Sequence, residues 1–114
     1  MIDENKALYF YKARIERVVD GDTVYATIDL GMGISRTETL RLAGINAPEM
    51  RGEDRYLGQQ SKDWLISKVE GMDVIVETIK DRSGKYGRLL AVIHFNNRDI
   101  NEEMVLNGMA VRYM

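Results

Sequence analysis

The sequence contains no cysteine, a single histidine and a single proline, and it has no long apolar run. Without cysteine the chain forms neither disulfides nor thiolate metal sites. One histidine, His94, is too few for zinc, which normally recruits several His or Cys side chains. Any metal is therefore expected to have oxygen ligands, as calcium and magnesium do. Because no segment approaches the ~20 apolar residues that cross a bilayer, we expect no membrane association.

A strong excess of one charge is also absent. The 16 Lys and Arg and 18 Asp and Glu residues give a formal net charge of −2. This balance argues against a non-specific nucleic-acid coat, which usually has a large basic excess. It allows a nuclease, because a metal site needs carboxylates and the bound cation supplies positive charge that the count ignores. Residues 1–6 lack the basic-then-apolar profile of a secretory signal, which predicts a cytoplasmic protein, or a secreted one if a leader was removed.

The hydrophobic pattern predicts mostly strands. A length of 114 residues supports one compact domain, residues 1–114. Period-two alternation and β-rich composition predict strands at 8–19, 23–30, 37–43, 72–79 and 89–95. In the second of these, Val24, Ala26, Ile28 and Leu30 are expected on the buried face.

Two segments read as helices. A period near 3.6 predicts a helix over 56–69, with a stripe formed by Leu57, Trp64, Leu65 and Val69. A short helix is predicted over 101–107, with Asn101 as N-cap, and Gly71 and Gly108 follow the two helix ends. Three strands, a helix, two strands and a helix are typical of a five-stranded OB-fold barrel, a mainly β (α+β) fold with one helix between strands three and four and a short C-terminal helix. The alternative is another small α+β roll.

Three segments carry residues suited to chemistry. Asp20-Gly21-Asp22-Thr23 places two carboxylates at a predicted Asp-Gly hairpin turn, and by itself it is also typical of an ordinary turn. The segment 41–49 carries an arginine, an amide and a carboxylate, and Pro48 biases Ala47 towards an extended conformation that fixes the direction of its carbonyl. These oxygens are compatible with a hard-cation site, and equally with a solvent-exposed loop. Lys85-Tyr86-Gly87-Arg88 precedes a strand, where a solvated basic hairpin is the simpler interpretation.

Taken together, Asp-Gly-Asp-Thr, Arg-Leu-x-Gly-Ile-x-x-Pro-Glu and Lys-Tyr-Gly-Arg resemble, in order and spacing, the motifs of the staphylococcal nuclease (thermonuclease) family. The resemblance runs from about Arg14 to Tyr113 and includes the late Asn101-Glu102 and Asn107-Gly108-Met109-Ala110 pattern. It implies that Ca²⁺ is held by Asp22, Asn46 and the backbone carbonyl of Ala47, with Asp20 acting from one layer further out. It implies that Arg41 and Arg88 grip the scissile phosphate and that Glu49 positions or deprotonates the attacking water. Lys85, Tyr86 and Tyr113 match residues that line the nucleotide pocket.

The implied activity is calcium-dependent hydrolysis of DNA and RNA by water attack on phosphorus, cleaving at the 5′ oxygen to leave 3′-phosphates. A cation and guanidinium forks suit this reaction because negative charge builds on the non-bridging oxygens. No base-reading signature is present, so we expect a monomer that acts on single-stranded nucleic acid without sequence specificity. Two features depart from the family. Asn46 stands where the best-known member has an aspartate, which predicts weaker calcium binding, and the family's final C-terminal helix is expected to be absent.

The competing function is an OB module that binds single-stranded nucleic acid or a protein partner without catalysis, because fold does not settle function. Arg41, Glu49 and Arg88 together favour the enzyme, since hydrolysis uses each of them and binding has no evident need for all three. A sugar-binding barrel has less support, because the predicted pocket is charged rather than aromatic.

Overall fold

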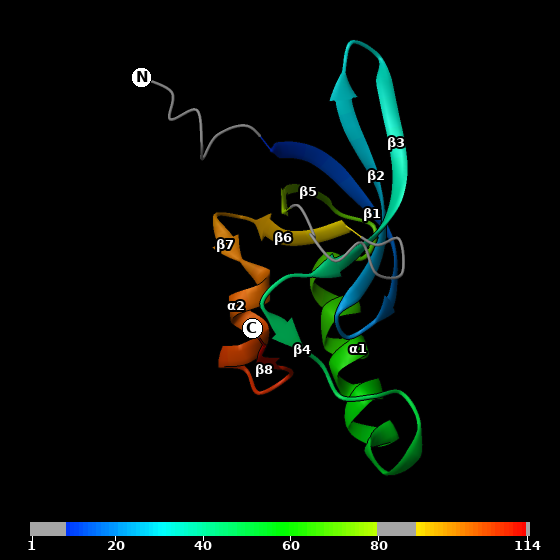
Figure 1. Ribbon diagram of the computed structural model, residues 1–114, viewed down its shortest axis with the longest axis vertical. Coiled ribbons are helices and arrows are strands. Elements are labelled where there is room, and N and C mark those ends of the chain that lie inside the picture. Colours follow the sequence, from blue (N-terminus) through cyan, green and yellow to red (C-terminus); the bar gives the residue numbers. More distant parts are fainter. Residues whose placement is uncertain (1–8, 80–88, 114) are drawn as a thin grey trace.

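The computed structural model describes residues 9–79 and 89–113. Its main sheet has the strand order β3-β2-β1-β5-β6-β7, and an additional parallel pairing between β3 and β6 closes it into a barrel (Figure 1). The five barrel strands are β1 (Phe10–Asp20), β2 (Thr23–Gly31), β3 (Ile34–Leu42), β5 (Asp73–Ile79) and β6 (Leu89–Phe95). The other described elements are β4 (Ile45–Asn46), the 3₁₀ turn η1 (Gly52–Asp54), α1 (Arg55–Val69), β7 (Arg98–Asp99), α2 (Ile100–Leu106) and β8 (Val111–Arg112). The predicted five-stranded OB-fold barrel is confirmed.

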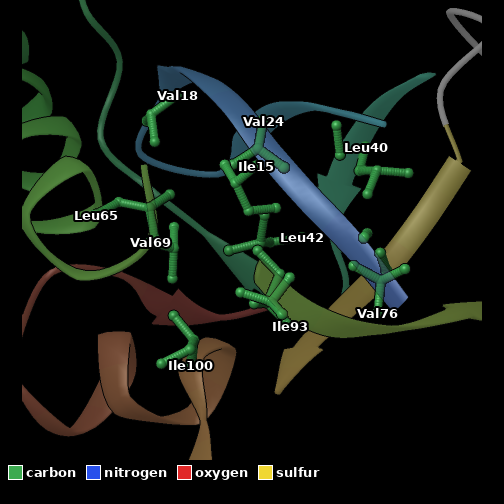
Figure 2. Close-up of a cluster of buried hydrophobic side chains, with 14 of the residues drawn as sticks. Ile15, Val18, Val24, Leu40, Leu42, Leu65, Val69, Val76, Ile93 and Ile100 are labelled. Atoms are coloured by element: carbon green, nitrogen blue, oxygen red, sulfur yellow. The ribbon is translucent and has the colours of Figure 1, made fainter. Parts of the chain in front are cut away.

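One core fills the barrel and extends under both helices (Figure 2). Alternation along each strand sends every second side chain inward, and the largest fully buried side chains are Ile15, Leu40, Leu42, Leu65, Ile93, Ile100 and Met104. The predicted buried face of β2 holds for Val24, Ala26 and Ile28 but not for Leu30, which is 41% exposed. Leu30 lies near the tip of the β2–β3 hairpin, which extends past the closed part of the barrel (Figure 1). Within the described residues, β3 pairs with β6 only from Leu40 to Leu42, so no described strand covers that end.

A side chain completes the parallel seam between β3 and β6. Beyond Leu42, the Ala43 amide donates to the Ala91 carbonyl at 2.8 Å, and the next rung of a parallel ladder would join the Ile93 amide to the Ala43 carbonyl. The carboxamide of Asn101 stands between those two groups. Its Oδ1 accepts from the Ile93 amide at 3.1 Å, while its Nδ2 donates to the carbonyls of Ala43 and Ala91 at 2.9 and 3.0 Å. Asn101 therefore joins β3, β6 and α2 at one point.

The position of Asn101 corrects one prediction. The N-cap of α2 is Asp99, whose Oδ1 accepts from the Glu102 amide at 2.9 Å, and the helix begins at Ile100. Asn101 lies inside the helix and is 4% exposed. Asp and Asn are both good N-caps. Here the Asn101 carboxamide lies in the barrel seam instead, because it can both accept from a backbone amide and donate to backbone carbonyls of the two strands.

Helix α1 buries Leu65 and Val69 of the predicted stripe and packs Trp64 against the core, but Leu57 does not belong to the buried face. Its buried residues are Gly58, Ser61, Leu65 and Val69, while Leu57 is 48% exposed. Towards the C-terminal end, the large side chains enter the core (Figure 2). Near the N-terminal end, a Cβ on Gly58 would lie 2.7 Å from the Glu49 carbonyl carbon, so only a residue without a side chain fits there. A membrane-spanning helix would need a longer and more apolar segment than any helix in the described part of the chain.

The helix ends follow the predicted pattern. Gly71 and Gly108 follow the last turns of α1 and α2 with φ of 78° and 73°. This is the left-handed conformation that glycine adopts most readily.

Candidate functional site

A cleft of ≈ 650 Å³ lies where the β1–β2 turn, the end of β3 and the loop after β4 meet. Of the residues predicted for the site, its lining includes Asp20, Asp22, Arg41, Asn46, Ala47, Glu49 and Tyr113. The predicted residues Lys85, Tyr86 and Arg88 lie outside the described residues. A second hollow of ≈ 780 Å³, lined in part by Lys12, Ile34 and Phe95, contains none of the predicted site residues that the structure describes. The chemistry suggested by the sequence is therefore concentrated in the first cleft.

The β1–β2 turn holds the Asp22 carboxylate in one orientation. Thr23 Oγ1 donates to Asp22 Oδ1 at 3.2 Å, and the Ala47 amide donates to Asp22 Oδ2 at 2.9 Å. The Asp22 amide in turn donates to Asp20 Oδ1 at 3.1 Å. The two carboxylates of the first motif are thus linked to each other and to the loop of the second motif.

Gly21 has a different role from the one its turn motif predicts. Because β1 and β2 pair Asp20 with Thr23, the turn residues are Gly21 and Asp22 rather than Asp20 and Gly21. Neither Gly21 nor Asp22 has a positive φ, so this is not the type I′ turn that an Asp-Gly pair favours. A Cβ on Gly21 would lie 2.8 Å from the Cβ atoms of both Ala47 and Ser61. The glycine therefore allows the turn to pack closely against the second-motif loop and against α1.

Arg41 extends from β3 into the cleft and contacts three oxygens. Its Nη2 donates to Asn46 Oδ1 at 3.0 Å and lies 3.5 Å from Asp22 Oδ2, while Nη1 donates to the Leu42 carbonyl at 2.6 Å. The Arg41 and Asp22 side chains are each 14% exposed, so this ion pair is largely shielded from water. The contacts fix a guanidinium beside the predicted cation-binding oxygens.

The Asp20 carboxyl, which lines the cleft, has a perturbed pKa. Burial raises the pKa of its carboxyl above the ordinary value, and the adjacent Asp22 carboxyl raises it further. The hydrogen bond from the Asp22 amide acts in the opposite direction. The cleft therefore disfavours a negative charge on Asp20, and a nearby cation would relieve this.

Glu49 and Tyr113 lie at the rim of the cleft and are exposed. The close approach of Gly58 to the Glu49 carbonyl places the Glu49 backbone against α1. The Tyr113 amide donates to the Gly44 carbonyl at 2.9 Å, which fixes the end of β8 beside the loop before β4. Arg51 also lines the cleft, although the sequence offers no signal for it beyond its position two residues after Glu49.

The residues present suit a hard cation. Asp22 and Asp20 supply carboxylates, Asn46 an amide oxygen, and Ala47 a backbone carbonyl, which are the oxygen types that calcium binds. Within residues 9–79 and 89–113, His, Asp and Glu side chains form no cluster of three or more that could hold a metal. A cation in this cleft would therefore depend on Asn46 and on the backbone as well as on the two aspartates.

The sequence of this chain is similar to those of known proteins. Residues 39–114 match the family described as "Staphylococcal nuclease homologue". An "Uncharacterized endonuclease" of Haemophilus influenzae is 37% identical over 101 residues, covering 88% of this chain and 51% of that protein. The "Thermonuclease" of Staphylococcus hyicus is 26% identical over 100 residues, covering 85% of this chain and 56% of that protein. "Endonuclease YhcR" of Bacillus subtilis is 30% identical over 113 residues, covering 90% of this chain and 9% of that protein.

This chain thus spans about half the length of the first two relatives and a small part of the third. The matched family region contains β4, both helices and most of the cleft residues, while the β1–β2 turn precedes it. On the family match, the chain belongs to the staphylococcal nuclease homologue family.

Proposed function

We propose that this chain is a calcium-dependent nuclease, a hydrolase that cleaves phosphodiester bonds in DNA and RNA. The observation that carries the proposal is the cleft itself, which gathers Asp22, Asn46 and Arg41 within contact distance and places Glu49 at its rim. Family membership and three relatives named as nucleases support the same activity. The oxygens of Asp22, Asn46 and Ala47 would hold the cation, with Asp20 close behind them.

The cleft residues divide the work of hydrolysis. A bound divalent cation supplies positive charge that stabilises the phosphoryl oxygens as they gain negative charge. The Arg41 guanidinium donates hydrogen bonds to those oxygens through its planar fork of N–H groups. The Glu49 carboxylate accepts a hydrogen bond from a water and either orients it or takes its proton. Arg88 is the predicted second phosphate-binding arginine.

The bond changes follow from attack by water. The water oxygen bonds to phosphorus, the bond between phosphorus and the 5′ oxygen breaks, and the released 5′ oxygen takes up a proton. The products are a 3′-phosphate and a 5′-hydroxyl. Arg41, Arg88 and Glu49 are assigned to the phosphate and the water rather than to base edges, so we propose cleavage without sequence preference, and we propose single-stranded nucleic acid as the substrate. We also propose a monomeric protein.

The test compares cleavage of single-stranded DNA in calcium and in EGTA. We expect degradation in calcium alone, with 3′-phosphate ends, and at least a ~100-fold loss of rate in Arg41→Ala, because one preorganised donor to the developing charge is removed. Arg36→Ala is the matched control, since Arg36 lies on the same strand with a side chain that is 69% exposed. Binding of the DNA without cleavage at millimolar calcium would contradict the proposal and indicate a non-catalytic OB module.

A further inference from the structure

Arg41 lies against the same oxygens that the proposed function assigns to the cation. Its Nη2 is 3.0 Å from Asn46 Oδ1 and 3.5 Å from Asp22 Oδ2. A single nitrogen therefore bridges the amide of one motif and the carboxylate of the other. The other amino group donates to the Leu42 carbonyl at 2.6 Å and orients the guanidinium plane.

A guanidinium and a divalent cation make incompatible demands on this position. A calcium ion needs its oxygen ligands at ~2.3–2.6 Å, and an ion held by Asn46 Oδ1 and Asp22 Oδ2 would share both oxygens with the Arg41 nitrogen, which lies 3.0 and 3.5 Å from them. The guanidinium and a divalent cation that share these oxygens would repel each other, and water screens the repulsion only weakly because the Arg41 and Asp22 side chains are largely buried. Asp22 Oδ2 also accepts from the Ala47 amide, so little of its capacity is free for both cations.

We propose that Arg41 competes with the divalent cation for Asn46 Oδ1 and Asp22 Oδ2. The inference rests on the cation site of the proposed function and adds a second role for Arg41. The ion reaches full affinity only when the guanidinium turns from these oxygens to a phosphate, and this links cation binding to substrate binding. The neutral amide of Asn46 suits such an exchange, because it holds the arginine by a hydrogen bond rather than by an ion pair.

Calorimetric titration of Ca²⁺ in the absence of nucleic acid tests the competition. The proteins are the unsubstituted chain, Asn46→Asp, Arg41→Met and the double variant. We expect Arg41→Met to tighten calcium binding about tenfold, which corresponds to about 1.4 kcal/mol. We also expect Asn46→Asp to increase affinity more in the Arg41→Met background than alone, because in the presence of Arg41 the new carboxylate is partly occupied by the guanidinium.

Arg36→Met is the matched control for the charge. It removes the same charge from the same strand at a side chain that is 69% exposed, and we expect calcium affinity to be nearly unchanged. Equal affinities in Arg41→Met and Arg36→Met, or strict additivity of the two cleft substitutions, would overturn the proposal. If neither the unsubstituted chain nor any of the variants binds calcium, the cation site of the proposed function is wrong, and the proposed competition is wrong as well. If the unsubstituted protein cleaves in a calcium-dependent way but Arg41→Met binds calcium with unchanged affinity, the competition is overturned and the proposed function is not.

A measurement on the unsubstituted protein removes any dependence on folded variants. In ¹⁵N-resolved NMR, the side-chain signals of Arg41 and Asn46 should move together on addition of calcium, since their mutual hydrogen bond is broken. An Arg41 signal that stays in place while Asn46 responds would show that the two cations do not compete.

Discussion

Replacing Asn101 by alanine should destabilise the fold far more than a typical polar-to-alanine substitution. The side chain is 4% exposed and makes three hydrogen bonds to backbone groups of β6 and the segment after β3. Alanine leaves the Ile93 amide without its acceptor and the Ala43 carbonyl without its donor, whereas the Ala91 carbonyl keeps the Ala43 amide. At about 1–3 kcal/mol for each unsatisfied buried group, the two orphaned groups cost about 2–6 kcal/mol.

A loss of that size is a large share of the ~5–15 kcal/mol by which small domains are stable. The assay is equilibrium urea unfolding, which reports the change as a shift of the midpoint at constant slope. Asn107→Ala is the matched control, because Asn107 caps the same helix, is exposed, and donates only to the Glu103 carbonyl among its side-chain contacts in the described ranges. Its loss should cost at most ~1 kcal/mol.

A second substitution at the same position separates the donor from the acceptor. Asn101→Asp keeps an oxygen for the Ile93 amide but turns a charged oxygen towards two carbonyls, so it should be destabilising at neutral pH and partly restored in acid, where a protonated carboxyl donates again. If Asn101→Ala lies within ~0.5 kcal/mol of Asn107→Ala, the barrel seam does not depend on the carboxamide and the reasoning is refuted.

Two further predictions concern the supports of the cleft. Gly58→Ala should destabilise the protein by about 1–2 kcal/mol and slow cleavage, because a Cβ there would lie 2.7 Å from the Glu49 carbonyl carbon; urea unfolding checks it against Gln60→Ala at an exposed position of the same helix, and equal stability of the two would contradict it. Asp20→Asn should raise the melting temperature in EGTA at pH 7, because a carboxyl whose pKa is raised on folding stabilises only while protonated and loses that contribution as pH rises through the folded pKa. The gain should vanish below the ordinary pKa of 3.8, and a gain that persists there would show a cause other than charge.

The barrel could be predicted from the sequence because its cause is local. Alternation in 23–30 and the apolar run at 89–95 each reflect one strand with one buried face, and the structure places those strands at Thr23–Gly31 and Leu89–Phe95. The sequence pattern predicts the start of β3 at Thr37, three residues after its actual start at Ile34, because Ile34, Ser35 and Arg36 are all exposed in the projecting hairpin and show no alternation.

The errors arose where distant segments meet. The sequence predicts Asn101 as a helix cap. Only the structure shows that the Ile93 amide and the Ala43 carbonyl are not bonded to each other and that the Asn101 carboxamide bonds to both. The prediction that Leu57 lies on the buried face of α1 is wrong. Apolar side chains mark the buried face of a helix only where the helix packs against other side chains, rather than against backbone. At that end of the helix the partner is the Glu49 carbonyl, and the sequence signals it only by Gly58. The resemblance of the motifs predicts residues such as Asp22, Arg41 and Asn46 that line the cleft, whereas the bridge from Arg41 to Asn46 and Asp22 needed coordinates.

The initial rate of calcium-dependent cleavage in Glu49→Gln, relative to Glu53→Gln, tests the central claim most directly. Both residues are exposed carboxylates in neighbouring parts of one loop, but only Glu49 lines the cleft. If the cleft hydrolyses phosphodiesters with Glu49 acting on the attacking water, Glu49→Gln should lose at least ~100-fold in rate while Glu53→Gln stays near the unsubstituted protein. Equal rates in the two variants would contradict the assignment of catalysis to this cleft.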